Sequence, residues 1–371
     1  MVEVNRPLLP GCVPSCPACR HRSFSADQSE AVKLRWVHHQ LSPWRSRIRP
    51  IRGPAPERRH GYRDRLSLTA KWTSNGWHFG VMRRDQLIPI PECPVHSIRS
   101  RRVLQVLAAA LPSADRFPMA YYIQSGAQAT LVLKTSTKPH LSWLTETTRQ
   151  GLASADLGGL WLNLHPSAGL RLFAKRGWQL IWGMPESRSA LGFLHGPEAF
   201  QQVLAELHGL SLDEAEAFLN PGPGEAVLDL YCGHGATLAR WLGRGATTLG
   251  IELGGEAVRY ARLNAPGAQI LQGSCATRLP QLRAWVSQHA RPIAYINPPR
   301  TGIEPPVLDW TMREARPSKI AYLSCSMKTL ARDLTALSDA GYRVESVQPY
   351  DFFPQTDHVE ALCLLSAGDD R

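Results

Sequence analysis

The chain has 371 residues, which is enough for two or three domains that each bury a hydrophobic core. Hydrophobic residues make up 43% of it and charged residues 20%, so the composition excludes a disordered chain, and no apolar run approaches a membrane span. The N-terminal stretch Met-Val-Glu-Val-Asn-Arg contains an acid and no apolar core, so we expect no signal peptide, a cytoplasmic location and no membrane partner.

Positive charge is concentrated at the N-terminal end. Residues 1–102 hold 19 Lys and Arg against 7 Asp and Glu, whereas the other 269 residues hold 23 against 24. The arginines between positions 45 and 65 are interleaved with aromatic residues, namely Trp36, Trp44, Tyr62, Trp72 and Trp77. Guanidinium groups contact phosphates and aromatic rings stack on bases, so this pattern favours nucleic-acid binding. A solvated basic face is the alternative.

Four of the eight cysteines are clustered. Cys12, Cys16 and Cys19 are spaced C-x3-C-x2-C, and Cys93 follows in Pro-Glu-Cys-Pro. Cytosolic thiols stay reduced, so this clustering favours a metal over disulfides. Four thiolates suit a [4Fe–4S] cluster or a structural zinc. Three neighbouring ligands with one remote ligand favour iron–sulfur, and zinc stays open.

The first two predicted segments are basic and then β-rich. Residues 1–97 are predicted to form a metal-bound basic segment, with short strands at 66–72 and 77–81. Residues 98–199 are predicted to form a central α+β domain. Its predicted elements are a helix at 97–111 and strands at 129–134, 159–164 and 179–182.

After residue 200, strands alternate with helical stretches, which is typical of an α/β domain with a mostly parallel sheet. This third predicted domain spans residues 200–371, and the Pro-Gly-Pro-Gly at 221–224 precedes its first strand. Its strands are predicted at 226–231, 247–252, 292–296, 319–324, 343–347 and 359–365. Sheets of this kind bind ligands beyond the carboxyl ends of their strands.

A glycine loop, Asp229-Leu-Tyr-Cys-Gly-His-Gly235, follows the first of these strands. Gly233 and Gly235 permit a tight turn and the close approach of a ligand. Glu252 ends the next strand, where an acid can accept both hydroxyls of a ribose. A full G-x-G-x-x-G is lacking, so the pattern favours an adenosyl group without a pyrophosphate, and S-adenosylmethionine is the common cofactor of that kind. A simple turn is the alternative.

Two further motifs are predicted at the same edge. Asn297-Pro-Pro-Arg300 offers an amide that can read the edge of a planar base, but Asn-Pro-Pro also occurs in enzymes that methylate the amino group of adenine. Cys325 ends another strand. C5 of a pyrimidine is a weak nucleophile until a thiolate adds at C6, so this thiol favours C5 methylation. A buried structural thiol is the alternative. The C5 proton must then leave, and Glu360 is the candidate base.

Together these motifs resemble the RNA uracil-C5 methyltransferases, a family that includes bacterial tRNA and 23S rRNA enzymes. The matching stretches are 229–235, 250–252, 297–303, 324–334 and 353–360. The resemblance implies a Rossmann-like class I methyltransferase domain, a covalent Cys325–C6 adduct, and Glu360 as the base. Carried over by position, the implied cofactor contacts are Gln202, Tyr231, Glu252 and Asn297, beside Asp229, Gly233 and Gly235.

The N-terminal cysteines are similar to those of the [4Fe–4S] branch of the family, which implies that Cys12, Cys16, Cys19 and Cys93 bind a cluster. Asn297, where most relatives have Asp, is similar to the 23S rRNA branch without a TRAM domain (RlmC-like), and we expect a monomer acting on 23S rRNA. Leu204 and Ser326 stand where relatives have Asn. The alternatives are the same chemistry on the T-loop of tRNA, an amino-methyltransferase, and a non-catalytic RNA-binding protein.

Overall fold

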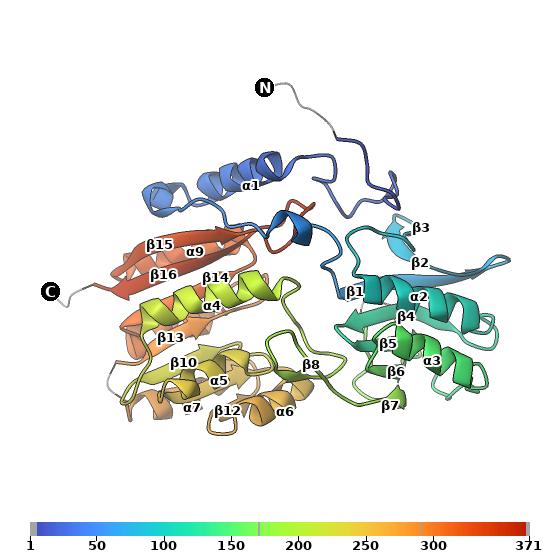
Figure 1. Ribbon diagram of the computed structural model, residues 1–371. Helices are drawn as coiled ribbons and strands as arrows, with labels where there is room; N and C mark the ends of the chain where they lie inside the picture. The colour runs from blue at the N-terminus through green and yellow to red at the C-terminus, as the bar shows by residue number, and fades with distance from the viewer. Residues whose placement is uncertain (1–5, 170, 290, 369–371) are drawn as a thin grey trace. The chain divides into compact units, whose positions relative to one another are not determined.

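The computed structural model describes residues 6–169, 171–289 and 291–368. The chain divides into two compact units (Figure 1). The N-terminal unit comprises Met1–Phe24 and Ala55–Val203, and the C-terminal unit comprises Ser25–Pro54 and Leu204–Arg371. This division differs from the three segments expected from the sequence, because residues 25–54 fold with the C-terminal unit and strands on both sides of residue 97 share one sheet.

The N-terminal unit is built on a seven-stranded sheet with the order β3-β2-β1-β4-β5-β6-β7. Neighbouring strands are antiparallel except β5 and β6, which are parallel. The strands are β1 (Arg65–Thr73), β2 (Gly76–Arg83), β3 (Gln86–Pro89), β4 (Met119–Ser125), β5 (Gln128–Leu133), β6 (Gly159–Leu164) and β7 (Trp178–Gly183), and β8 (Ser187–Arg188) pairs with β9 (Leu194–His195). The helices are η2 (Pro56–Arg58), α2 (Ile98–Ala110) and α3 (Glu146–Ser154).

Helix α2 of this unit follows from its sequence. Ser97 caps its start by accepting a hydrogen bond from the Ser100 amide at 3.1 Å. Val103, Leu104 and Leu107 recur at helical spacing, and all three are buried in the core of the unit. Cap and apolar stripe together account for the helix predicted at 97–111.

The C-terminal unit contains a second seven-stranded sheet, with the order β12-β11-β10-β13-β14-β16-β15. The first five strands in this order are parallel, and β16 is antiparallel to both of its neighbours. The strands are β10 (Ala226–Leu230), β11 (Thr247–Glu252), β12 (Gln269–Gln272), β13 (Ile293–Ile296), β14 (Lys319–Ser324), β15 (Tyr342–Tyr350) and β16 (Glu360–Ala367). The central strands are buried on both faces, as a sheet covered by helices on both sides requires.

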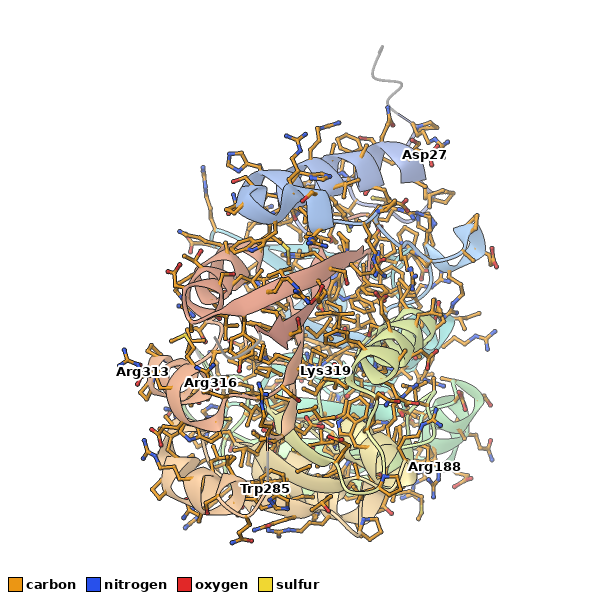
Figure 2. The ribbon with its side chains drawn as sticks, turned by 90° about the vertical axis from the view of Figure 1, so that its left-hand side faces the viewer. Asp27, Arg188, Trp285, Arg313, Arg316 and Lys319 are labelled. Carbon is orange, nitrogen blue, oxygen red and sulfur yellow. The ribbon has the colours of Figure 1, made fainter. Side chains whose placement is uncertain are left out.

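The helices of this unit are α1 (Ala26–Gln40), η1 (Ser42–Arg47), α4 (Ala205–Leu219), α5 (Ala236–Gly243), α6 (Gly255–Asn264), η3 (Ala276–Arg278), α7 (Leu279–Val286), α8 (Pro305–Trp310), the π-helical turn η4 (Thr311–Ala315) and α9 (Met327–Asp339). Most of them connect strands of the sheet, whereas α1, η1 and α4 precede its first strand (Figure 1). Lys319, at the start of β14, donates a hydrogen bond at 2.8 Å to the Phe218 carbonyl near the end of α4 (Figure 2). A cation at that end of a helix complements its dipole.

Helix α1 was not predicted from the sequence, and it belongs to the C-terminal unit. Ser25 and Gln28 form a capping box at its start, and Asp27 adds a favourable acid in the first turn (Figure 2). Its inner face places Val37 in the core of the unit. Beyond η1, residues 48–52 pair with the edge strand β15, so that edge is covered rather than open.

A buried ion pair fixes α1 to the chain that follows β15. Lys33 Nζ lies 2.5 Å from Asp351 Oδ1, and the two side chains are 1% and 0% exposed. Lys33 also donates a hydrogen bond to the Phe353 carbonyl at 3.1 Å. Asp351 and Phe353 open the connection to β16, so α1 holds the segment that leads to Glu360.

We expect Lys33→Met to lower the free energy of unfolding by about 3–5 kcal/mol, because Asp351 would remain buried without its cation. Urea unfolding measures the loss. The double variant Lys33→Met/Asp351→Leu should recover most of it. Arg283→Gln removes one partner of the half-exposed pair with Glu314 and should cost no more than about 1 kcal/mol. Equal stability of Lys33→Met and the wild type would show that the pair contributes nothing.

No helix in the described part of the chain combines the length and the apolar character needed to cross a lipid bilayer.

Candidate active site

The carboxyl edge of the C-terminal sheet brings together five residues that the sequence singles out. Strands β10, β11, β13 and β14 are parallel, and their registers place Leu230 beside both Ile251 and Ile296. Strand β16 runs the opposite way and begins at this edge, with Ala361 opposite Ser324. The positions next to these strand ends therefore share one edge: Tyr231, Glu252, Asn297, Cys325 and Glu360.

The loop after β10 has a backbone shape suited to close approach by a ligand. Tyr231, Gly233 and Gly235 have positive φ values of 64°, 56° and 82°. A Cβ on Gly235 would lie 2.8 Å from the Cα of Ala261, so glycine is required there. A Cβ on Gly233 would meet no atom within 4 Å, so the backbone is open on that side. A positive φ at the non-glycine Tyr231 is backbone strain of the kind found at binding sites.

Glu252 is held by amides at the sheet edge. One carboxylate oxygen accepts a hydrogen bond from the Gly233 amide at 3.0 Å, and the other accepts one from the Gly254 amide at 2.7 Å. An ionised carboxylate has about four acceptor positions. Glu252 is partly exposed and can therefore accept ribose hydroxyls while both amide contacts persist.

Asp229 does not reach the surface of this site, in contrast to its predicted contact with the cofactor. Its side chain is fully buried in β10 and accepts a hydrogen bond from Trp241 Nε1 at 3.0 Å. Burial raises the pKa of its carboxyl to about 7, although hydrogen bonds from Thr237 and Trp241 lower it. Asp229 therefore connects β10 to α5 through Trp241.

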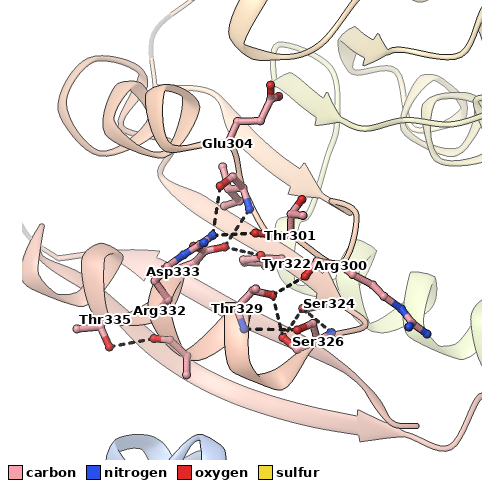
Figure 3. A network of polar contacts seen from close by, with 12 residues as sticks. Arg300, Thr301, Glu304, Tyr322, Ser324, Ser326, Thr329, Arg332, Asp333 and Thr335 are labelled. Atoms are coloured by element: carbon pink, nitrogen blue, oxygen red, sulfur yellow. Dashed lines mark hydrogen bonds and ion pairs between the residues drawn. The ribbon is translucent and has the colours of Figure 1, made fainter. Parts of the chain in front are cut away.

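The loop 297–303 is clamped by α9 (Figure 3). Asp333 is fully buried and accepts hydrogen bonds from the Ile303 amide at 3.0 Å and from the Tyr322 hydroxyl at 2.8 Å. Gly302 lies next to Asp333 with a φ of 78°. A Cβ at this position would lie 2.6 Å from Asp333 Oδ2, so only glycine fits there. The sequence motif at 324–334 therefore fixes the loop that begins with Asn297.

Cys325 lies directly after β14, partly exposed and close to two charged side chains. Burial and the nearby Glu360 carboxylate raise the pKa of its thiol, whereas the nearby Arg300 guanidinium lowers it. Glu360 itself is only 4% exposed. The structure thus groups a thiol, an acid and a guanidinium. Arg300 was missed as a site residue, although the motif Asn297-Pro-Pro-Arg300 contained the signal.

Ser326, where relatives have Asn, caps the start of α9. Its hydroxyl accepts a hydrogen bond from the Thr329 amide at 3.5 Å, and Ser and Asn are both favourable caps. The Thr329 hydroxyl in turn donates to the Arg300 carbonyl at 3.2 Å (Figure 3). The departure from the family pattern therefore preserves the helix start behind Cys325.

The other predicted positions lie at the borders of these elements. Gln202 is partly buried in the segment before α4, and Leu204 is fully buried at the start of that helix. The backbone N–H of Asn297 donates a hydrogen bond to the Leu230 carbonyl at 3.2 Å, which fixes Asn297 to the end of β10. The His358 ring contacts the Phe353 ring edge to face.

The four N-terminal cysteines belong to one unit. Among residues 6–169, 171–289 and 291–368, no group of three or more His, Cys, Asp or Glu side chains is placed to hold a metal ion. Burial, followed by the charges of Cys93, Cys16 and Cys12, raises the pKa of the Cys19 thiol to about 12. Gly11 permits a close approach to Glu92, since a Cβ there would lie 2.0 Å from the Glu92 carbonyl oxygen.

Two of the aromatic residues expected to stack on bases are unavailable. Tyr62 and Trp77 are 3% and 5% exposed and pack in the N-terminal unit. In this β-rich region these two aromatic side chains point inward and the neighbouring arginines point outward. Sequence alone does not distinguish this pattern from that of a nucleic-acid-binding surface. Trp36 and Trp72 are exposed, at 48% and 39%.

The strand order, the glycine loop and the acid after the second strand define the C-terminal unit as a Rossmann-like class I methyltransferase domain. The family model described as tRNA (Uracil-5-)-methyltransferase matches residues 277–368. The chain is 30% identical to an uncharacterized RNA methyltransferase of Halalkalibacterium halodurans, over 94% of this chain and 81% of that protein. The chain belongs to the RNA uracil-C5 methyltransferase family.

Two further comparisons agree with this family. The 23S rRNA (uracil(1939)-C(5))-methyltransferase RlmD of Pseudomonas aeruginosa is 27% identical, over 95% of this chain and 79% of that protein. The crystal structure of the Pyrococcus abyssi tRNA (uracil-54, C5)-methyltransferase in complex with S-adenosyl-L-homocysteine matches with a TM-score of 0.71. The match covers 95% of this chain and 86% of that chain at 20% identity, and it shows the shared fold.

Proposed function

We propose that this protein methylates C5 of a uridine in RNA, with S-adenosylmethionine as the methyl donor and Cys325 as a covalent nucleophile. The observation that supports this best is the grouping of Cys325, Glu360 and Arg300 at the sheet edge that also holds the glycine loop. An amino-methyltransferase needs no thiol there, because the target nitrogen supplies its own electron pair.

The residues at this edge fit an adenosyl cofactor. In the proposal, Glu252 accepts the ribose hydroxyls, the open backbone at Gly233 faces the cofactor, and Tyr231 and Asn297 provide further contacts. When bound, S-adenosylmethionine supplies an electrophilic methyl group. The fixed loop 297–303 would then hold the Asn297 amide against the edge of the uracil ring.

Cys325 opens the proposed reaction. Its thiolate adds to C6 of the uracil, and the electrons of the C5–C6 double bond move to C5 and O4 as an enolate. C5 forms a bond to the methyl group as the bond between that methyl and its sulfonium breaks. Glu360 then removes the proton from C5, the C5–C6 double bond re-forms, and the C6–sulfur bond breaks to release the Cys325 thiolate. Arg300, which lowers the pKa of the thiol, favours the attacking form.

We propose 23S rRNA as the substrate, supported by the relative that is named for that activity. The same chemistry on tRNA is the second candidate, supported by the fold of the Pyrococcus abyssi enzyme. Methyl transfer to separate unmodified 23S rRNA and tRNA transcripts distinguishes them, with nucleoside mass spectrometry of the products. 5-Methyluridine in rRNA alone is expected, whereas methyladenosine would refute the proposal. We also propose that the protein acts as a monomer in the cytoplasm.

We also propose that Cys12, Cys16, Cys19 and Cys93 hold a structural [4Fe–4S] cluster. The support is the C-x3-C-x2-C spacing of the first three cysteines and the close approach of Gly11 to Glu92, which brings the two cysteine segments together. A bound cluster would be held by these cysteines as thiolates, with release of their protons, and the positive charge of its iron would offset the repulsion between the thiolates. Anaerobically purified protein should contain iron and absorb near about 400 nm, a band typical of such clusters. Stoichiometric zinc without iron would contradict the cluster and would support a structural zinc site instead.

A further inference from the structure

We propose that residues 134–145, 165–169 and 171–177, which lie in two loops of the N-terminal unit, form a second RNA-binding surface. We call it the β5–β6 edge surface and define it by residues at the ends of β5 and β6 and the start of β7. They are Lys134, Lys138, Arg171, Phe173, Lys175, Arg176 and Trp178. This inference rests on RNA being the substrate, and it names where else the protein holds that RNA.

The fold places these two loops at one edge. Strands β5 and β6 are parallel and end in register, with Leu133 opposite Leu164. The His165 amide donates to the Leu133 carbonyl at 2.8 Å, which joins the two loops where they begin. Strand β7 returns beside β6, with Trp178 opposite Asn163, so residues 165–177 close at the same edge. Residues about thirty positions apart in the sequence therefore lie close together at this end of the sheet.

Side-chain hydrogen bonds fix two described positions of the second loop, Ala174 and Gly169. The Asn163 side chain is fully buried, accepts a hydrogen bond from the Ala174 amide at 2.8 Å, and donates to the Ala174 carbonyl at 3.2 Å. The Tyr121 hydroxyl donates to the Gly169 carbonyl at 3.1 Å. Cations on a loop held in this way lose less conformational freedom on binding than cations on a mobile one.

The positive charge of this surface is uncompensated. Neither loop contains an Asp or Glu in its sequence. Five cations are exposed and have no ion pair or hydrogen bond to their side chains from any residue the structure describes: Lys134, Lys138, Arg171, Lys175 and Arg176. Closely spaced cations without acidic partners raise the local potential and attract phosphates.

The arginine-rich N-terminal stretch differs, because several of its cations are already neutralised. Arg49 and Arg52 both pair with Glu214, at 2.7 and 3.4 Å. Arg99 pairs with Asp64 at 2.8 Å and also contacts Asp156. The excess of basic residues in residues 1–102 therefore overstates the charge available there, whereas the near-neutral remainder of the chain conceals a strongly basic edge.

Aromatic rings next to these cations favour RNA as the occupant. Phe173 lies against Trp178, with ring centroids 4.8 Å apart, and Trp178 contacts Trp161 edge to face. All three rings are partly exposed. Rings that stack on unpaired bases beside a basic backbone track are the usual platform for single-stranded RNA. An anionic membrane surface also attracts cations and aromatic rings, so the test must separate the two.

The triple variant Arg171→Gln/Lys175→Gln/Arg176→Gln tests the surface. With an unmodified 23S rRNA transcript as the probe, we expect at least a tenfold weaker Kd at 0.1 M salt. The slope of log K against log salt should become shallower by up to about 2, since each phosphate contact to a single strand contributes about 0.7. The KM for the transcript should rise while kcat at saturating RNA stays unchanged.

A matched control removes the same charge elsewhere on the same unit. Arg83→Gln/Arg84→Gln/Arg102→Gln replaces three exposed arginines that have no ion-pair partner among the described residues. This control should keep the wild-type Kd and salt slope. An equal loss of affinity in both triple variants would reduce the effect to net charge and overturn the proposed surface.

Two further outcomes separate the surface from the proposed function. If the wild type forms 5-methyluridine and the triple variant has the same Kd, KM and salt slope, the surface is refuted and the function stands. If the wild type does not methylate RNA, the function fails first. Binding to vesicles containing anionic phosphatidylserine that the triple variant loses, with RNA affinity unchanged, would assign the surface to a membrane instead.

Discussion

Replacing Cys325 with alanine is expected to abolish methyl transfer, with a fall in kcat of at least about 10⁴-fold, as losses of covalent nucleophiles typically cause. C5 of uracil cannot attack the methyl group until sulfur has added at C6. The variant should bind S-adenosylmethionine normally, because the residues proposed to hold it lie on other strands. It should also form no covalent complex with RNA that contains 5-fluorouracil, in which fluorine replaces the C5 proton and prevents release.

Cys363→Ala is the matched control for that experiment. Cys363 is fully buried in β16, opposite Tyr322 of β14, so its removal deletes a thiol next to the same strand without touching the site. It should cost stability but leave the covalent complex intact. A complex that still forms with Cys325→Ala, seen as a shifted band on a denaturing gel, would contradict the assigned nucleophile.

The pH dependence of the reaction follows from the surroundings of the same thiol. Burial and the Glu360 carboxylate raise the pKa of Cys325. The nearby Arg300 guanidinium lowers it by less, so the pKa of the thiol stays above its ordinary value. The thiol form therefore dominates at neutral pH, and the thiolate fraction grows as pH rises. We expect the rate of adduct formation with RNA containing 5-fluorouracil to increase with pH up to and beyond the ordinary range of a cysteine. A rate that is flat from pH 6 to 9 would contradict this.

Glu360→Gln is expected to have the second largest effect, about 10²–10⁴-fold on turnover, the range typical of a general base. The substitution should spare the addition of sulfur and the formation of the new C5–methyl bond. It should block removal of the C5 proton, so a methylated RNA–protein adduct should accumulate on natural RNA. Because Glu360 raises the pKa of Cys325, the variant should also form its adduct at lower pH than the wild type.

Glu345→Gln provides the matched control for this carboxylate. Glu345 lies on β15 and pairs with Arg343 at 2.7 Å. Its replacement removes an acid from the strand next to β16 and should leave turnover unchanged. Mass spectrometry of the trapped species identifies the adduct with the methyl group present. Normal turnover of Glu360→Gln, or an adduct without the methyl group, would show that another group accepts the proton.

The fold of the C-terminal unit could be predicted because local pattern and tertiary structure agree there. Apolar strands followed by helices read as a parallel sheet, and the predicted strands at 247–252 and 319–324 coincide with β11 and β14. Helix α1 could not be recognised by its apolar stripe, because one inward position is Lys33 and its partner Asp351 lies at the far end of the sequence. Its capping box, Ser25 with Gln28, was the available signal.

The candidate site was predictable as a set of strand ends, less so as individual contacts. Topology alone brings Cys325 and Glu360 together, since β16 is antiparallel to β14. The buried position of Asp229 was not predictable, because an acid inside a strand is costly unless a partner such as Trp241 is supplied from another element. The β5–β6 edge surface was hidden for a related reason. Its charge arises from two loops that only the sheet makes neighbours.

Helix α1 has a consequence for how the protein is made. A gap of 318 residues separates Lys33 from Asp351, so the helix leaves the ribosome long before the strand and carboxylate it packs on exist. The apolar and cationic inner face of α1 must stay unsatisfied during nearly all of translation, and the C-terminal unit can close only after its last strands emerge. Premature termination before β15 would therefore release a chain with an uncovered helix, a natural target for chaperones or proteases.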